Sequence, residues 1–588
     1  MADVRAARVQ TSFLARLDSL YDASVSLEKA AAALPGDSAR VTATRVAFNR
    51  ARVQYKRLEY LLEYTAPISA MELNGAAVPQ VNLDEGRESI FPPTGFQVVE
   101  GLLYPTLPSA KVGALRTEIQ NLRERVDRAR DAVRENEGTD AKVFDALRIE
   151  IARICTLGIV GFDSPVRRAS MSEARAAIDG VREALTFYQI DLRKVAPAMA
   201  DSLARVLRAA DANLSEGTFD SFDRLRFIAL YANPLARAIA AVRDALKIPV
   251  PLEERFWRAS AATLFQRDAF DVDAVRPLWA PRPTPPRVAL GRQLFFDPIL
   301  TGGGRTCATC HDPKHAFTDG LATSTRLTPG TRLRNTPTLI NAGLQTSQFS
   351  DMRAPFLEDQ VAIVVHSQAE MGSSLEAIVG RVKANPDYVK QFQAAFAGLP
   401  DAEITTRSIR MALAAYVRSL IALDSRADRA MNGNLAALTA EERRGFNLFT
   451  GKAACATCHF IPLTNGAMPP VYMETEQEVI GVPAAPVWQQ AHVDDDSGRA
   501  GVTHASLHRF AFKPPTLRNV ALTAPYMHNG VYRTLEEVVR FYNGGGGAGI
   551  GINLPNQTLG ADGLRLTDAE QRALIMFMRA LTDTVPSK

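Results

Sequence analysis

Two short motifs carry the residues of this chain that are best suited to chemistry. In each, two cysteines are separated by two residues and followed at once by a histidine, and both motifs read CATCH. The spacing C-x-x-C-H is typical of covalent c-type haem attachment, in which the cysteines form thioethers and the histidine is an axial iron ligand. The predicted attachment residues are Cys307, Cys310 and His311 for one haem and Cys455, Cys458 and His459 for the other. The alternative is a bare C-x-x-C redox or zinc site, which the repeated histidine disfavours.

The composition excludes several other classes of protein. The 588 residues are 46% hydrophobic and 22% charged, which is ordinary for a soluble protein of several domains. The net charge is only +4 and no long Lys/Arg tract occurs, so we expect no nucleic-acid partner. No window of about 18 uninterrupted apolar residues predicts a membrane span. The fifth cysteine, Cys155, has no free partner for a disulfide and is predicted to be a small buried apolar residue.

The predicted location follows from the haem chemistry. Haem is attached to such motifs outside the bacterial cytoplasm, so we expect a periplasmic protein. The first thirty residues have no apolar core of a secretory signal and run directly into a charged helical pattern. We therefore expect that an export signal has been trimmed from the sequence shown.

The elements that position the motifs are predicted to be helices, which makes the fold mainly α. Residues 1–267 read as a multi-helix bundle because apolar side chains recur at helical spacing. Two such faces comprise Phe13, Leu17, Leu20, Tyr21 and Val25, and Phe48, Ala51, Tyr55, Leu58 and Leu62. Further amphipathic stretches lie near 110–135, 139–155, 171–190, 198–213, 221–246 and 253–267, and no strand alternation is visible.

A proline-rich segment separates this bundle from the haem motifs. Five prolines fall within residues 276–286, so residues 268–286 are predicted to be a linker. Two cytochrome c-like haem domains are then expected, at 287–438 and at 439–588. The last helix, about residues 568–581, follows Thr567, a plausible N-cap.

One stretch of the bundle resembles a metal-binding motif. Residues 93–104 (PTGFQVVEGLLY) open a helix and are similar to imelysin-like domains, whose G-x-H-x-x-E motif is thought to bind metal. Gln97 stands where that family has histidine, and an amide is a poorer transition-metal ligand than imidazole. The alternative is that Gln97 and Glu100 are simply a polar pair on a helix.

Motifs after residue 286 resemble the bacterial dihaem cytochrome c peroxidase and MauG family over about residues 287–585. They are LGRQLFFDP (290–298), CATCHDPKHAFTDG (307–320), RNTPT (334–338), LEDQ (357–360), EM (370–371), PTLRN (515–519) and APYMHNG (524–530). Many separate motifs in one order make the resemblance specific. It implies a peroxidase whose substrate is hydrogen peroxide and whose electrons come from a small redox protein, a cytochrome c or cupredoxin, or from a protein substrate.

The resemblance also implies catalytic residues. A haem peroxidase must move a proton from the near to the far oxygen of peroxide, and a carboxylate suits this task. In the family an acid in the E-M motif does so, assisted by a glutamine ten residues earlier. Glu370 and Gln360 stand at these positions. No histidine occurs between His315 and His366, so the first haem is expected to be open to peroxide without prior reduction, as in the MauG-like subgroup.

The second haem is expected to be closed and to serve electron transfer. Tyr542 stands where the peroxidases place a Met ligand and MauG-like proteins a Tyr, and a phenolate stabilises ferric and higher states. The alternatives are a packed aromatic without a ligand role, or ligation by Met468, Met473 or Met527.

Two further family features lie between the haems. The resemblance implies a structural Ca²⁺ held by the Asn335 side chain and by the carbonyls of Thr523 and Pro525, and such oxygen ligands suit this ion. The family usually has a Trp in an F-W-D-G-R motif, but here the matching residue is Ser350. Because serine cannot relay an electron, the route between the haems is an open question.

The sequence therefore predicts a MauG-like dihaem peroxidase fused to a helical domain. Two other functions remain open. One is a dihaem electron carrier without catalysis, in which both irons are six-coordinate. The other is a metal-binding helical module whose haem half changes the redox state of what it delivers, for example iron.

Overall fold

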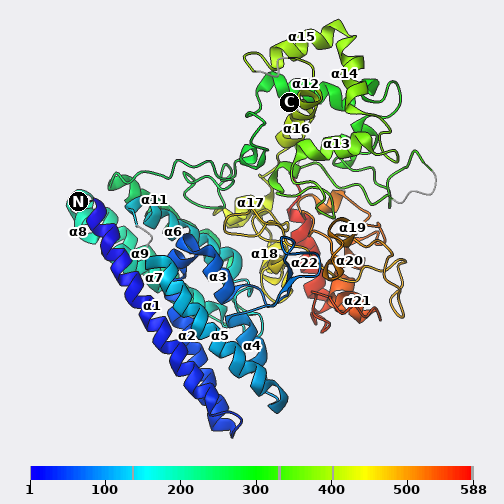
Figure 1. Ribbon diagram of the computed structural model, residues 1–588. Coiled ribbons are helices and arrows are strands. Elements are labelled where there is room, and N and C mark those ends of the chain that lie inside the picture. Colours follow the sequence, from blue (N-terminus) through cyan, green and yellow to red (C-terminus); the bar gives the residue numbers. More distant parts are fainter. Residues whose placement is uncertain (1, 135–137, 329–332, 400–402, 584–588) are drawn as a thin grey trace.

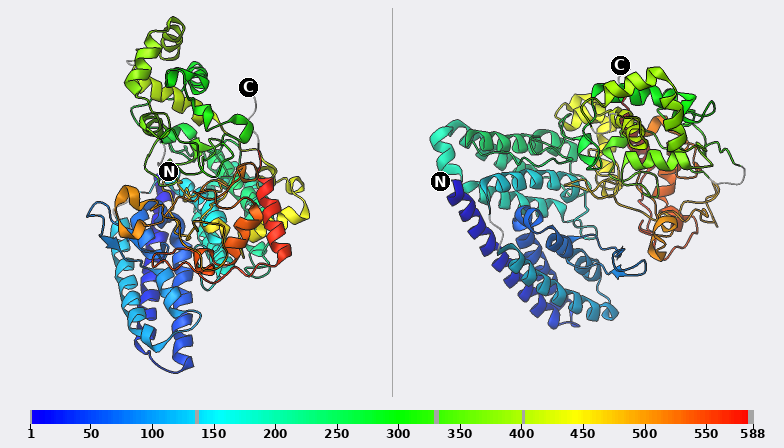
Figure 2. Two further views of the ribbon diagram at one scale, coloured as in Figure 1. Left: turned by 90° about the vertical axis from the view of Figure 1, so that its right-hand side faces the viewer. Right: turned by 45° about the horizontal axis from the view of Figure 1, so that its top comes forward.

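The computed structural model describes residues 2–134, 138–328, 333–399 and 403–583. These residues are mainly helical, as predicted, and contain one small sheet. Figure 1 shows three regions in chain order: a bundle of long helices in blue to cyan, a green region with α12 to α16, and a yellow-to-red region with α18 to α22. The views in Figure 2 agree that the bundle adjoins the yellow-to-red region.

Long antiparallel helices form the N-terminal region. Predicted apolar faces are buried here, with Phe48, Tyr55 and Leu62 fully inaccessible to solvent. Cys155 is also fully buried, as predicted. The helices are α1 (Ala2–Ala32), α2 (Ser38–Thr65), α3 (Pro67–Asn74), α4 (Phe96–Leu103), α5 (Val112–Arg134), α6 (Asp140–Arg153), α7 (Ser170–Thr186), α8 (Gln189–Val195), α9 (Pro197–Asn213), α10 (Arg224–Phe227) and α11 (Asn233–Ala245).

A two-stranded hairpin interrupts the bundle, which the sequence pattern did not predict. Strands β1 (Gln80–Val81) and β2 (Ile90–Phe91) pair in antiparallel fashion. The loop between them reaches the C-terminal region, where the Ser506 hydroxyl donates to the Glu88 carboxylate at 2.8 Å.

The predicted helix at 253–267 is wrong. This segment folds back on residues 269–271 instead: the Arg258 N–H donates to the Ala269 carbonyl at 2.9 Å, and the Asp271 N–H donates to the Phe256 carbonyl at 2.7 Å. Phe256 is buried, so the apolar spacing is real. The backbone N–H and C=O groups nevertheless form their hydrogen bonds across a loop, and not with residues four positions away as in a helix.

The predicted linker overlaps the first helix of the middle region. Helix α12 (Pro285–Phe296) begins with the last two linker prolines, which suit the first turn because its N–H groups need no intrahelical acceptor. The other middle helices are α13 (Leu357–His366), α14 (Leu375–Lys383), α15 (Pro386–Ala395), α16 (Thr406–Ser419) and α17 (Arg426–Met431). The domain boundaries stay a prediction.

The C-terminal region consists of short helices and long ordered loops. Its last helix begins after Thr567, whose side chain accepts from the Glu570 N–H, so the predicted N-cap is confirmed. The helices are α18 (Ala440–Phe449), α19 (Ala500–Thr503), α20 (Leu535–Asn543), α21 (Gly546–Gly549) and α22 (Asp568–Ala580).

The same helix crossing occurs before each motif. Helix α12 crosses α16 at Gly291, and α18 crosses α22 at Gly445. A side chain at Gly291 would collide with the carbonyl of Ala412, and one at Gly445 with the carbonyl of Ala573. Both crossings therefore depend on the close backbone approach that glycine permits.

The described residues form three hydrophobic cores. One core contains only side chains from residues 279–422, including the partly buried Cys307. A second joins side chains of the N-terminal bundle to those of the C-terminal region, such as Phe446, Ala456 and Tyr472. A small third cluster surrounds Tyr532 and Phe541. The bundle and the second motif thus share one core.

One helical stretch within the described residues, Arg224–Ala245, has the length and composition that a membrane span requires. Its mean hydropathy is 1.3 and 56% of it is buried inside the protein. A buried core helix of a soluble protein can have the same length and hydropathy.

Candidate haem sites

The first motif lies on a tight turn that gathers its three residues. Residues Cys307–Thr309 form a 3-10 turn, and Thr306 and Thr309 cap it reciprocally. The His311 N–H donates to the Cys307 carbonyl at 3.0 Å. The Nδ1 of His311 lies 3.0 Å from the carbonyl of Phe317. An Nδ1–H bond to a carbonyl leaves Nε2 free as a ligand and fixes the ring orientation.

Glu370 lies close to this motif. Burial raises the pKa of the Cys310 thiol, and the Asp319 and Glu370 carboxylates add to this shift. The Arg305 guanidinium donates to the Glu370 carbonyl at 3.3 Å and anchors this turn. Burial raises the pKa of Glu370, while the Arg353 guanidinium opposes the shift. Gln360 is half-buried on α13, the helix that precedes the turn.

Arginines surround the segment that carries Ser350. The Arg353 guanidinium lies 3.4 Å from the ring centroid of Phe349 and pairs with Asp351 at 2.8 Å. Arg334 also pairs with Asp351, at 2.6 Å, and with Asp496 at 2.7 Å. The pair with Asp496 ties the middle region to the C-terminal region. Ser350 itself accepts at its carbonyl from the Lys513 N–H at 2.8 Å.

A buried lysine lies beside Ser350. The Lys513 ammonium donates to the Gln345 side chain at 2.5 Å and to the Ser347 carbonyl at 2.6 Å. Burial lowers the pKa of Lys513 to about 7, and the Asp351 carboxylate only partly offsets this. Ser350 occupies the position at which the sequence resemblance implies a Trp. The buried ammonium group of Lys513 lies near this serine.

The second motif forms the same turn in different surroundings. Residues Cys455–Thr457 form a 3-10 turn, and the His459 N–H donates to the Cys455 carbonyl at 2.9 Å. The Nδ1 of His459 lies 3.0 Å from the Pro515 carbonyl, which again leaves Nε2 free. Burial lowers the pKa of His459 to about 4, so the ring is neutral and able to ligate at neutral pH.

Tyr542 lies at the second motif. Burial raises its pKa, and the nearby thiols of Cys458 and Cys455 and the carboxylate of Glu478 add to the shift. The Cys458 thiol donates to Glu478 at 2.9 Å. Of the alternative methionines, Met473 is 54% exposed. The ligand role of Tyr542 stays a prediction.

The predicted calcium residues belong to adjoining segments. The Asn335 N–H donates to the His528 carbonyl at 2.8 Å, which brings it beside the loop that carries Thr523 and Pro525. The Asn335 amide nitrogen donates to the Leu321 carbonyl at 2.8 Å, so the side-chain oxygen is the atom that could face a cation. These are hard oxygen donors.

The bundle makes direct contact with the second motif. The ring of Phe162 packs edge-to-face on Phe460, the residue after His459, with centroids 5.9 Å apart. Fully buried Tyr472 packs on Phe270 at 5.4 Å and donates to the Ile461 carbonyl at 2.8 Å. The sequence pattern did not reveal these contacts, which join segments about 200 to 300 residues apart.

The imelysin-like residues have structural partners. Glu100 accepts from the Ser164 hydroxyl at 3.1 Å and from the Arg167 N–H at 2.7 Å, so it caps a turn. The Gln97 amide donates to the Asn74 carbonyl at 3.1 Å. Among the described residues, no group of three or more His, Cys, Asp or Glu side chains is arranged to hold a metal ion.

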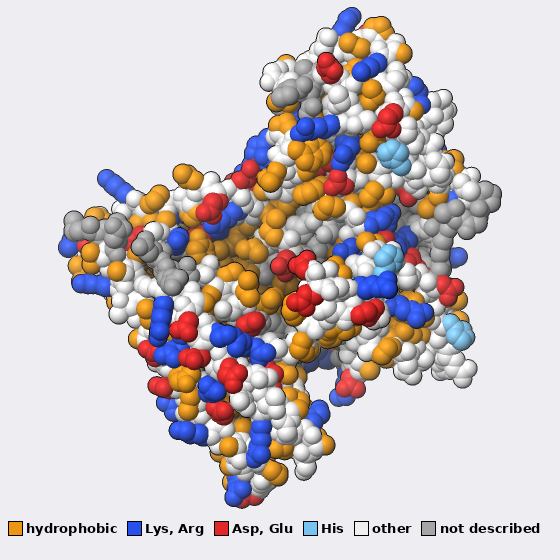
Figure 3. Space-filling model, viewed as in Figure 1, with side chains coloured by type: hydrophobic (Ala, Val, Ile, Leu, Met, Phe, Trp, Pro, Cys, Tyr) orange, Lys and Arg blue, Asp and Glu red, His pale blue; other side chains and the backbone are white. Residues whose placement is uncertain are grey.

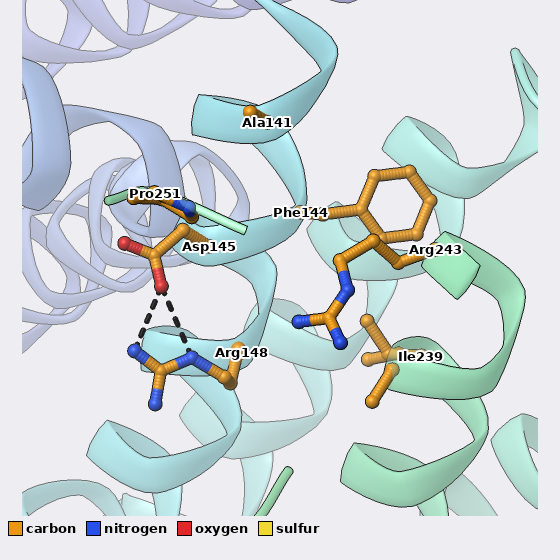
Figure 4. A pocket seen from close by; sticks show the side chains of 8 residues that line it. Ala141, Phe144, Asp145, Arg148, Ile239, Arg243 and Pro251 are labelled. Carbon is orange, nitrogen blue, oxygen red and sulfur yellow. Dashed lines mark hydrogen bonds and ion pairs between the residues drawn. The ribbon is translucent and has the colours of Figure 1, made fainter. Parts of the chain in front are cut away.

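A small pocket of the bundle lies between α6 and α11. Figure 4 shows Asp145 paired with Arg148 at its wall, with Phe144 and Arg243 opposite. Its lining contains no histidine, cysteine or tyrosine.

Comparisons with known proteins match the part of the chain that contains the first motif. The family model for di-haem cytochrome c peroxidase matches residues 285–436. The methylamine utilization protein MauG of Methylorubrum extorquens is 34% identical over 314 residues, which are 52% of this chain and 82% of that protein. The cytochrome-c peroxidase IdrP1 of Denitromonas iodatirespirans is 34% identical over 52% of this chain and 83% of its own.

Two further matches cover similar lengths. The cytochrome c551 peroxidase of Nitrosomonas europaea is 33% identical over 45% of this chain and 76% of its own. Among solved structures, a MauG-like protein associated with microbial copper homeostasis is 30% identical over 53% of this chain and 96% of its own, with a TM-score of 0.44.

Proposed function

Since this chain belongs to the di-haem cytochrome c peroxidase family, which includes MauG, we propose that it is a periplasmic MauG-like peroxidase. It reduces hydrogen peroxide at one haem and draws electrons through the other. The electrons come from a small redox protein or from an oxidisable residue of a protein substrate. On the face seen in Figure 3, basic and acidic side chains are interspersed, so charge there does not single out one docking area.

The family implies two haem c groups, and the residues of both motifs fit them. Each turn offers two thiols that are in no disulfide and one imidazole whose Nδ1 is already engaged with a carbonyl. This is the donor set that covalent attachment and axial ligation require. When bound, one haem supplies an iron for peroxide and the other exchanges electrons.

The position of Glu370 is the observation that carries the proposal. Its backbone carbonyl is bound by Arg305, two residues before Cys307, and burial raises the pKa of its half-buried carboxyl, which suits a group that both accepts and returns a proton. Glu370 takes the proton from the near oxygen of hydrogen peroxide and delivers it to the far oxygen. Gln360 orients the peroxide. The Arg353 guanidinium lowers the pKa of Glu370 and so limits the rise that burial causes.

At the second motif, the chain closes the site. His459 and Tyr542 are the side chains that would hold a haem iron here, and a site with both ligands supplied by the protein would serve electron transfer. The Asn335 side chain and the carbonyls of Thr523 and Pro525 would hold a Ca²⁺, which would link their two segments. The Arg334 ion pairs with Asp351 and Asp496 support the same junction.

The test is Glu370→Gln in the full haem-loaded chain. The amide keeps the shape but cannot transfer the proton, so we expect peroxide turnover with a reduced cytochrome or cupredoxin to fall by about 10²- to 10⁴-fold. The matched control is Glu376→Gln, because that side chain is 74% exposed on the following helix. A loss below about tenfold for Glu370→Gln, or an equal loss in the control, contradicts the proton-transfer role.

A further inference from the structure

Phe162 is the aromatic side chain of the N-terminal bundle that packs on the residue next to His459. Phe162 meets fully buried Phe460 edge-to-face, at 5.9 Å between centroids and an interplanar angle of 65°. Phe460 directly follows His459, whose imidazole is held by the Pro515 carbonyl at 3.0 Å. The turn that carries His459 is thus held by the Pro515 carbonyl on its own region and by Phe162 from the bundle.

Phe162 is held in place by a buried network of charges. The next residue, Asp163, accepts from Lys56 at 2.6 Å, from Arg153 at 2.8 Å and from the Asn74 amide at 3.0 Å. The side chains of Lys56, Arg153 and Asp163 are at most 5% exposed. Breaking a buried ion pair leaves an uncompensated charge and costs several kcal/mol, so the backbone at Phe162 has little freedom.

The preceding residue adds a second constraint. Gly161 has φ +96°, and a side chain there would clash with the ring of Phe219. The segment also follows a π-helical turn, Ile154–Gly158, which ends α6. Each of these features fixes the direction from which Phe162 leaves the bundle.

Among the described residues, no aromatic contact from the bundle reaches the first motif. Its core draws side chains only from residues 279–422 of the described chain, whereas Ala456 of the second motif is fully buried in the core shared with the bundle. The two motifs therefore differ in whether the N-terminal region reaches them.

We propose that Phe162 is a positioning residue for His459, through which the N-terminal bundle sets the reduction potential of the second haem. Axial-ligand orientation, burial and the local dielectric all tune such potentials. The ring of Phe162 holds the His459 turn and excludes water beside it. Removing the ring admits water, which stabilises the more highly charged oxidised state and lowers the potential. This inference rests on the proposed function in that His459 carries a haem.

The experiment is a potentiometric titration of both haems in full-length, haem-loaded Phe162→Ala and Phe162→Leu. We expect Phe162→Ala to lower the potential of the second haem, by at least a threefold change in its reduction equilibrium, and to leave the first haem unchanged. Phe162→Leu retains part of the apolar bulk, so we expect it to lower the potential of the second haem by a smaller amount. If Phe162→Ala does not fold, the intermediate shift of Phe162→Leu decides.

The matched control is Phe144→Ala. Phe144 is a buried bundle aromatic that packs edge-to-face on Tyr188 at 5.0 Å, beside the pocket of Figure 4. It should lower the melting temperature without moving either potential. Unchanged potentials in both Phe162 variants overturn the inference, and so does an equal shift in the control. If Phe162→Ala shifts the potential of the second haem as expected but the parent protein does not turn over peroxide, the result contradicts the proposed function and leaves this inference standing.

Discussion

The two C-x-x-C-H motifs share their letters and their turn, but they lie in different surroundings. The first belongs to a core of its own, with Glu370 and Arg353 nearby. The second shares a core with the N-terminal bundle and has Glu478 and Tyr542 beside its cysteines. Identical motifs can therefore have different chemistry, because the residues that decide it come from distant segments.

The difference suits a division of labour. An acid beside the first motif can move protons, which peroxide cleavage requires. A phenol and a neutral imidazole at the second can close an iron, and burial limits the rearrangement that accompanies electron transfer. The bundle strengthens this contrast. Its side chains share a hydrophobic core with the second motif, whereas the core at the first motif contains only residues 279–422 of the described chain.

The largest expected effect comes from Tyr542→Phe. Loss of the phenol oxygen opens the second haem, so its ferric spectrum should change from low spin to high spin while the first haem keeps its spectrum. The control is Tyr532→Phe, because Tyr532 is equally aromatic, fully buried and stacked on Trp488. A spectrum of Tyr542→Phe that matches the parent protein would assign the ligand to another residue.

A smaller effect is expected from Lys513→Met. The folded-state pKa of about 7 lies below the usual lysine value of about 10.4, so the unfolded chain binds more protons between these pH values. The stability of the parent should therefore rise with pH from about 7 to 10. Below pH 7 the buried Lys513 carries its charge, so the free-energy cost of burying that charge is fully present. In this range Lys513→Met should be more stable than the parent protein.

Thermal unfolding across this pH range measures the effect. The charged groups around Lys513 are the Asp351 carboxylate, which raises its pKa, and the guanidinium groups of Arg334, Arg353 and Arg499, which are bound to the Asp351 segment. Lys383→Met, at an exposed site on α14, is the control and should keep the slope of the parent. Equal slopes in the parent and in Lys513→Met would mean that the amine does not titrate in this window.

Local features of the fold were predictable, and long-range ones were not. Helix α22 and its N-cap Thr567 follow from apolar spacing and a capping residue, both visible in a short window. The segment 253–267 has the same spacing, yet its backbone pairs with residues 269–271. A periodic pattern reports which side chains are buried, not which backbone groups pair.

The same limit applies to the sites. The attachment residues have a fixed spacing, and Glu370 was found from a motif. Phe162 and Lys513 carry no motif, and their importance comes from contacts with Phe460 and Ser350. The buried charges Arg52 and Lys56 also look like ordinary surface residues of a helix, because only the partners Glu173 and Asp163 reveal their burial.

The central claim is that the two motifs hold unequal irons, and electron paramagnetic resonance of the ferric, haem-loaded full chain tests it most directly. The account predicts one high-spin signal from the open haem at His311 and one low-spin signal from the closed haem at His459, in equal amounts. Two low-spin signals, with no change on adding hydrogen peroxide, would contradict it and favour an electron carrier.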